Sequence, residues 1–216
     1  MYDVNIVQVV GTNHASTGKS EDAILITEND QFLCLGIADG KSGCRFGKEG
    51  GQIALKAVFD YITTKKDLFT KCEMHEYEAK SEIFKIVREE LERQAASLST
   101  SIKELASTLV VMIIDKVTGE YLICHLGDGC ILGINKENIS FISTPKNGIT
   151  QKYTWTTASS RAAENISIKR YSNIKLYSTI YLMSDGCECF HQGIYIPFRG
   201  KEVLLSAEKV QLEKNM

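Results

Sequence analysis

Two groups of short apolar runs, separated by two long amphipathic stretches, limit the fold of this 216-residue chain more than any other feature. The first group reads as strands over Val4 to Val10, Ala23 to Thr27 and Gln31 to Ala38, the last two forming a hairpin. The second group begins after position 106. Strands and helices do not alternate one by one, as a parallel sheet would require. The order therefore predicts an α+β fold with antiparallel sheets.

The central stretches carry the periodicity of helices. Between Lys48 and Thr64, apolar residues such as Ile53, Ala57 and Tyr61 recur at helical spacing, and a second amphipathic pattern runs from Glu76 to Ser97. Glycines at 47, 50 and 51 would let the start of the first helix pass close to another segment.

The second group of strands forms a meander, followed by a polar stretch and two more strands. The strands are expected at Ser107 to Asp115, Glu120 to Leu126, Gly129 to Asn135, Ile139 to Ser143, Ile166 to Tyr171 and Leu176 to Ser184. The polar stretch, Thr144 to Asn165, is long for a turn and holds Trp155, the only tryptophan. It is either a mobile flap beside a site or a surface loop with Trp155 docked onto the core.

Composition limits the class of protein. No linker-like or low-complexity stretch divides the chain, so we expect residues 1–216 to form a single domain. The net charge of −2, without a basic cluster, predicts no nucleic-acid partner. No apolar run is long enough to cross a membrane, and no signal segment opens the chain. Together with seven cysteines, an odd number, this indicates reduced thiols and a cytoplasmic location, and we expect a monomer.

Acidic residues follow three of the apolar runs. Asp39, Asp128 and Asp185 each come directly after, or within two residues of, a predicted strand, and Glu21 and Asp22 precede another. Strand ends gather side chains at one rim, where carboxylates repel one another unless cations lie between them. Oxygen ligands of this kind suit Mg²⁺ or Mn²⁺. A single Asp-Gly is more often a turn, but four acidic clusters in this arrangement favour a metal site.

Six short motifs resemble the metal-dependent type-2C serine/threonine protein phosphatases (the PPM family), especially compact bacterial members. In order they are Gly11-Thr12-Asn13-His14, Gly18-Lys19-Ser20-Glu21-Asp22-Ala23, Ile37-Ala38-Asp39-Gly40, Ser107-Thr108-Leu109-Val110, Leu126-Gly127-Asp128-Gly129 and Leu182-Met183-Ser184-Asp185-Gly186. The resemblance implies a four-layer α-β-β-α sandwich, two antiparallel sheets flanked by helical pairs, with two Mg²⁺ or Mn²⁺ ions in a cleft between sheet edges.

The resemblance also assigns roles. Asp39 would bridge the two metals, Gly40 would offer its carbonyl, Glu21 would complete the second metal and Asp185 would bind the first. Asp128 would serve a further, weaker metal, or simply form a turn. A water between the metals would then attack a phosphorylated protein substrate, without a covalent intermediate.

Three departures from the family pattern affect these roles. Thr17 stands where the family usually has a phosphate-binding Arg, so His14 or Lys19 would supply the positive charge, and both also have ordinary structural interpretations. Lys41 replaces a candidate general acid, and is better suited to attract phosphate than to donate a proton.

The third departure is the loss of a late acidic ligand. No Asp occurs from Gly186 to Met216, where the family usually closes its first metal site; Glu188, Glu202 and Glu208 are candidate substitutes, although a surface role suits each of them better. The first metal should therefore bind weakly. Three hypotheses remain: a metal-dependent hydrolase of phosphoserine and phosphothreonine in proteins, which we favour, a phosphatase-fold regulatory or binding module, and an unrelated α+β domain.

Overall fold

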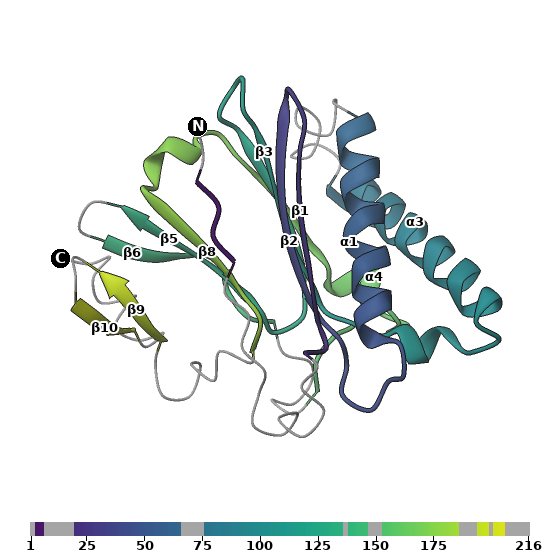
Figure 1. Cartoon of the computed structure of the whole chain (residues 1–216). Coiled ribbons are helices and arrows are strands. Elements are labelled where there is room, and N and C mark those ends of the chain that lie inside the picture. The colour runs from purple at the N-terminus through teal and green to yellow at the C-terminus, as the bar shows by residue number, and fades with distance from the viewer. Residues whose placement is uncertain are drawn as a thin grey trace.

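Two antiparallel sheets face each other, and a pair of helices covers one of them (Figure 1). The structure, a computed structural model, describes residues 3–6, 20–65, 76–135, 138–146, 153–185, 194–198 and 201–205. Within these residues the α+β class and the two facing antiparallel sheets that the sequence predicts are confirmed.

The larger sheet has five strands in the order β1-β2-β3-β4-β7. Its strands are β1 (Asp22–Glu28), β2 (Phe32–Asp39), β3 (Leu109–Asp115), β4 (Tyr121–Leu126) and β7 (Ser167–Tyr171), and each neighbouring pair is antiparallel. The β1–β2 hairpin turns through Asn29, whose side-chain oxygen accepts the backbone N–H groups of Gln31 and Phe32. An Asn in this role is typical of tight turns.

The smaller sheet has the order β6-β5-β8. Its strands are β5 (Cys130–Asn135), β6 (Asn138–Ser143) and β8 (Thr179–Met183). A short 3₁₀ turn, η3 (Ile174–Leu176), leads into β8. A separate hairpin of β9 (Ile194–Phe198) and β10 (Lys201–Leu205) lies toward the C-terminal end of the chain.

Strand periodicity explains the two layers of core. In β3 all seven residues are buried, because alternate side chains point to opposite faces that are both covered. Leu109, Val111 and Ile113 join the core on the helix side, whereas Val110 and Met112 join the core between the sheets. Burial of each such side chain contributes about 1.5–3 kcal/mol to stability.

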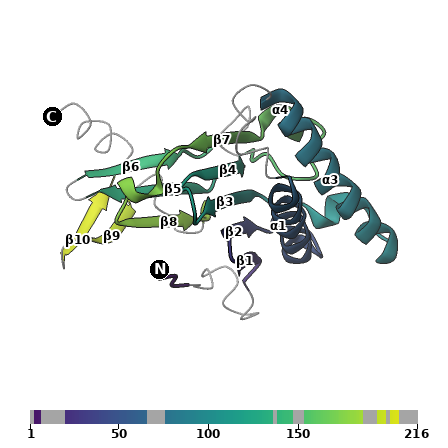
Figure 2. The same ribbon diagram turned by 90° about the horizontal axis from the view of Figure 1, so that it is seen from above.

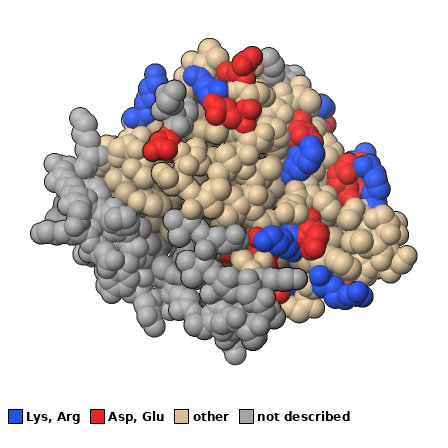
Figure 3. All heavy atoms as spheres, in the orientation of Figure 1, with Lys and Arg blue, Asp and Glu red and all other residues tan. Residues whose placement is uncertain are grey.

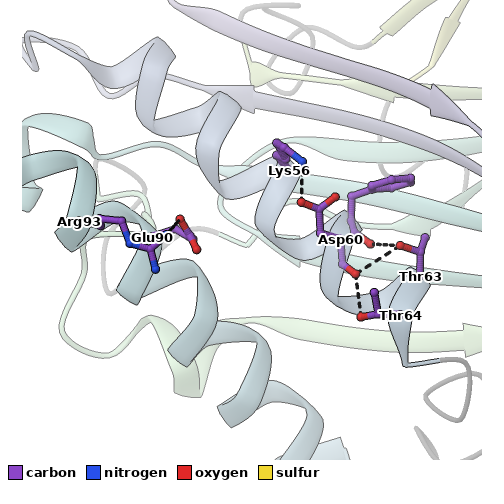
Figure 4. Close-up of polar contacts among 7 residues, drawn as sticks. Lys56, Asp60, Thr63, Thr64, Glu90 and Arg93 are labelled. Carbon is purple, nitrogen blue, oxygen red and sulfur yellow. Dashed lines mark hydrogen bonds and ion pairs between the residues drawn. The ribbon is translucent and has the colours of Figure 1, made fainter. Parts of the chain in front are cut away.

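Helices α1 (Gly47–Thr64) and α3 (Glu76–Ser97) pack on the outer face of the five-stranded sheet, as Figure 2 shows from above. Their outward faces carry local polar contacts (Figure 4), such as the 2.6 Å Lys56–Asp60 pair on α1 and the 2.7 Å Arg93–Glu90 pair on α3. Exposed pairs of this kind add only a few tenths of a kcal/mol. The buried apolar faces therefore hold the helices in place.

Glycines bring the start of α1 against the sheet and its neighbouring loop. A Cβ added at Gly50 would lie 1.9 Å from the carbonyl oxygen of Leu105, in the 3₁₀ turn η2 (Ile102–Leu105). One added at Gly47 would lie 2.9 Å from the Cα of Gly40, directly after β2. The close approach expected from the glycines is confirmed, and it sets the first turn of α1 beside the end of β2.

Both predicted helices and most predicted strands are present within a few residues of their expected bounds. The exception among them is the strand expected at Val4 to Val10: residues 3–6 form no strand, and residues 7–10 lie outside the described residues. The β9–β10 hairpin and the short helix α4 (Ala162–Asn165) were not expected from the pattern. The described helices longer than one turn all lie over the five-stranded sheet, so the second helical pair is not seen in this part of the chain.

Charged side chains of both signs are interspersed over the face shown in Figure 3, among many uncharged residues. In the described part of the chain, no helix is long and apolar enough to cross a membrane.

Candidate metal centre

Three carboxyl groups from different strands meet at one end of the sheets. Asp39 is the last residue of β2, and the hairpin register places Asp22, the first residue of β1, directly opposite it. Asp185 follows β8 of the other sheet by two residues. The Asp39 carboxyl hydrogen-bonds with both Asp185 and Asp22, and the Ser184 hydroxyl lies 3.5 Å from Asp22 Oδ2. The rim expected from the strand ends is therefore formed.

Burial and two neighbouring carboxyl groups favour the protonated form of Asp39. Burial is the largest cause that raises its pKa, and the charges and hydrogen bonds of Asp185 and Asp22 raise it further, to about 9. Without a cation, a proton on Asp39 thus lets the three carboxyl groups share one small space at neutral pH.

The backbone of Asp39 is fixed from the side of β3. Its N–H donates to the hydroxyl of Thr108 at 2.8 Å, and the N–H of Thr108 donates back to the Asp39 carbonyl at 2.8 Å. Gly40 forms a further antiparallel bridge with Ser107. Asp39 is therefore held by a neighbouring strand as well as by its hairpin partner.

Asp128 lies in the turn between β4 and β5, after Gly127, whose φ of 109° favours glycine. Its Oδ2 accepts the Thr154 hydroxyl at 2.5 Å, while its buried Oδ1 has no hydrogen-bond partner among the described residues. Burial raises the pKa of this carboxyl, the Thr154 hydrogen bond opposes the change, and the charge of Asp185 adds to it. Asp128 is therefore close enough to Asp185 to be influenced by it.

Glu21 and Gly40 meet through their backbones. The Gly40 N–H donates to the Glu21 carbonyl at 3.2 Å, and a Cβ on Gly40 would lie 2.9 Å from that oxygen and 2.9 Å from the Lys48 nitrogen in the first turn of α1. Only glycine fits between these groups. The carboxyl contacts of Asp39 in the described residues involve Asp22 and Asp185, not Glu21.

Asp22 and Asp185 both contact the carboxyl group of Asp39. Within the described ranges, no group of three or more His, Cys, Asp or Glu side chains is arranged to hold a metal ion. The possible donor atoms are nonetheless all oxygens, and one carboxylate oxygen of Asp128 has no hydrogen-bond partner among the described residues. This donor chemistry fits a hard divalent cation.

The family model described as protein phosphatase 2C matches residues 10–213, nearly the whole chain. The chain belongs to the protein phosphatase 2C family. A search of curated proteins finds no match.

Solved structures share this fold at low sequence identity. A C. elegans sex-determining protein matches 82% of the chain with 13% identity and a TM-score of 0.55, and the chain spans half of that protein's length. A bacterial serine phosphatase matches 77% of the chain and 72% of its own, with 17% identity and a TM-score of 0.51. The photosystem II phosphatase PBCP matches 96% of the chain and 70% of its own, with 16% identity and a TM-score of 0.50. These structures share the fold of the chain, in agreement with its family.

Within this phosphatase 2C fold, the predicted site residues divide into two groups. Asp39, Asp128 and Asp185 lie at one rim, with Gly40 and Glu21 beside it. His14 and Lys19, predicted to attract phosphate, lie outside the described residues, as does Gly186. Lys41 directly follows Gly40 and has an exposed side chain.

Four residues at the rim were given no role by the sequence. Asp22, Thr108, Ser184 and Thr154 all contact the acidic groups or their backbone. Counting back from the tight turn of the β1–β2 hairpin would have placed Asp22 opposite Asp39. No local signal would have found Thr154, because it is 26 residues from Asp128.

Residues 153–165 of the polar stretch include Trp155, which packs against the core. Trp155 is 9% exposed and belongs to the core on the helix side, with Tyr153 at its edge, the ring centroids 5.3 Å apart. Of the two interpretations of this stretch, docking of Trp155 onto the core is therefore the one that holds for residues 153–165. Residues 147–152 lie outside the described part of the chain.

Proposed function

We propose that this phosphatase 2C protein hydrolyses phosphoserine and phosphothreonine in proteins, using two Mg²⁺ or Mn²⁺ ions. The observation that carries the proposal is the contact of Asp39 with both Asp185 and Asp22, which brings carboxyl groups of both sheets together in a chain of this family.

The residues that would hold the ions are Asp39 as the shared ligand, Asp185 for the first ion, Glu21 and the Gly40 carbonyl for the second, and Asp128 for a weaker third. When bound, the ions would activate a water as the nucleophile and offset negative charge on the phosphoryl oxygens. The unpartnered Oδ1 of Asp128 supports this assignment, since a buried carboxylate oxygen normally has a partner.

The chain's own groups prepare this site. Loss of the Asp39 proton leaves three adjacent carboxylates, whose mutual repulsion a cation would relieve, so cation binding and proton release are linked at this residue. The pair of hydrogen bonds with Thr108 keeps Asp39 in place while the charge changes. His14, Lys19 and Lys41 are proposed to attract the phosphate.

Asp22 is proposed to replace in part the acidic ligand that the family usually supplies late in the chain. It lies opposite Asp39 and in hydrogen-bond contact with it. The expected result is that Asp22→Asn weakens Mn²⁺ binding to the first site in calorimetric titration, whereas Asp30→Asn, in the exposed hairpin turn, leaves binding unchanged.

One observation favours a second candidate, a regulatory module of the phosphatase fold without turnover. The described carboxyl groups are not arranged around a metal position. A module of this kind would bind a phosphorylated partner but would not release phosphate from it.

Phosphopeptide hydrolysis separates the two candidates. The enzyme should release phosphate from phosphoserine and phosphothreonine peptides with Mn²⁺ or Mg²⁺, lose activity with a chelator, and regain it when metal is restored. Binding of the same peptides without release at any metal concentration would favour the regulatory module.

The proposal extends to the setting of the protein. We propose a single domain that acts as a monomer on phosphorylated proteins in the cytoplasm.

A further inference from the structure

Thr154 contacts the carboxylate of Asp128 from a distant part of the chain. Its hydroxyl donates to Asp128 Oδ2 at 2.5 Å, across 26 residues of sequence. A carboxylate that accepts a hydrogen bond at one oxygen loses rotational freedom, so its other oxygen is directed as well. For Asp128 that other oxygen is Oδ1, which is buried and has no partner among the described residues.

The segment that carries Thr154 is held by the residues that directly follow it. Trp155 packs into the helix-side core, and its carbonyl oxygen lies 3.2 Å from where a Cβ on Gly127 would be. Thr157 donates its N–H to the Ser107 carbonyl at 2.8 Å, and its hydroxyl accepts the Ser107 N–H at 3.3 Å. Thr154 therefore contacts Asp128 from a fixed backbone.

The turn that carries Asp128 is also held from a second direction. The N–H of Lys146 donates to the Gly127 carbonyl at 2.8 Å. Because the backbone of the turn is held, only rotation of the Asp128 side chain could still move its carboxylate. The hydrogen bond from the Thr154 hydroxyl restricts that rotation.

We propose that Thr154 is a positioning residue, which holds the Asp128 carboxylate so that its Oδ1 is available to a divalent cation. The inference rests on the proposed function, because that function supplies the cation. Residues that orient metal ligands typically change metal affinity or activity 10–100-fold when removed.

The test compares Thr154→Val with Thr154→Ser. Valine keeps the shape of threonine without the hydroxyl, and serine restores the hydroxyl. The matched control is Thr156→Val, because the Thr156 hydroxyl in the same segment is buried and lies 3.2 Å from Ser159 Oγ. Mn²⁺ binding is followed by calorimetry, and phosphopeptide turnover is measured as a function of Mn²⁺ concentration.

The expected result is that Thr154→Val weakens the weakest Mn²⁺ site about 10-fold. It should raise the Mn²⁺ concentration needed for half-maximal turnover by a similar factor, with peptide KM unchanged. Thr154→Ser should restore most of the affinity, and Thr156→Val should behave like wild type. In an Asp128→Asn background, Thr154→Val should have no further effect, which separates positioning from a general loss of folding.

Two outcomes would overturn the inference alone: equal Mn²⁺ binding by wild type and Thr154→Val, or the same loss in Thr154→Val and Thr156→Val. If wild type bound no Mn²⁺ at all, the proposed function would fail together with it.

Discussion

At the scale of single residues, Asp39 combines contacts to carboxyl groups of both sheets with a raised pKa. It lies opposite Asp22 in one sheet and contacts Asp185 from the other, and its pKa is raised to about 9, first by burial and then by these neighbours. A group that is neutral without metal and charged with metal can be replaced by an uncharged isostere without disturbing the metal-free fold.

Asp39→Asn should therefore abolish phosphatase activity while changing the metal-free free energy of unfolding by less than about 1 kcal/mol. The amide resembles the protonated carboxyl in shape, but it is a poor bridge between two cations. Turnover at saturating Mn²⁺ and urea unfolding with a chelator measure the two effects. The exposed Asp30→Asn serves as the control, and near-normal turnover of Asp39→Asn would rule out Asp39 as the bridging ligand.

His125 gives the fold a pH dependence of its own. It is fully buried on β4, its Nδ1 is 2.6 Å from the Ser143 hydroxyl, and its Nε2 has no partner in the described part of the chain. Burial, and after it the charge of Lys146, lower its pKa to about 4, while a backbone hydrogen bond with Gly127 opposes the change. Below the ordinary pKa of about 6.5 the unfolded chain binds a proton that the folded chain excludes.

The contribution of neutral His125 to the free energy of unfolding should therefore be fully present above pH 6.5 and should fall as the pH decreases toward 4. The lowered pKa of His125 predicts a loss of about 2 kcal/mol between pH 7 and pH 5. His125→Leu, which suits the apolar space between the sheets, should lack this part of the pH dependence. Urea unfolding of both proteins from pH 5 to pH 8 measures the difference, and parallel pH profiles would show that His125 does not cause it.

At the scale of elements, the contact between α1 and the η2 turn has no room for a side chain at Gly50. Gly50→Ala would bring a Cβ to within 1.9 Å of the Leu105 carbonyl oxygen, so backbone must move. The clash should cost about 1–3 kcal/mol, more than the roughly 1 kcal/mol that alanine adds as a better helix former.

Thermal unfolding of Gly50→Ala in a chelator tests this contact without any influence of metal. Gln52→Ala, at an exposed position of the same helix, should change stability by no more than about 0.5 kcal/mol. Stabilisation by Gly50→Ala would mean that helix propensity outweighs the close approach of α1 to η2.

The elements themselves were largely predictable because their signals are local. Helical spacing of Ala54, Val58 and Ile62 marks α1, and a continuous apolar run from Phe32 to Ala38 marks β2. The β9–β10 hairpin escaped prediction because Ile194–Phe198 contains Pro197, which weakens a strand signal. The packing of Trp155 into the helix-side core could not be predicted either, because the polar residues around it do not indicate which part of the molecule it would contact.

At the scale of the whole molecule, metal binding should stabilise the fold, because ligands come from strands of both sheets and the intact site exists only in the folded chain. With the late Asp absent, we expect binding in the millimolar range of Mn²⁺. At ten times the dissociation constant the gain is about 1.4 kcal/mol, which raises the Tm of a domain of this size by roughly 3–6 °C.

Thermal unfolding across a Mn²⁺ series measures this gain, with chelator as the reference and Asp39→Asn as the matched variant. The variant should show little change in Tm with added Mn²⁺. An equal rise in both proteins would indicate binding elsewhere on the molecule. Saturation at micromolar Mn²⁺ would contradict the weak first site and would agree with a full replacement of the missing ligand.

The sequence by itself determined the α+β class, most elements and the residues Asp39, Asp128 and Asp185 at the ends of strands, because these follow from periodicity and motifs within a few residues of each other. Only the tertiary structure decided which groups meet. The pairing of Asp22 with Asp39, the contact of Asp185 across the sheets, and the Thr154 bond to Asp128 depend on register and on the packing of distant segments. The physical reason is that contacts between residues far apart in the chain are set by the packing of whole elements, which no local pattern encodes.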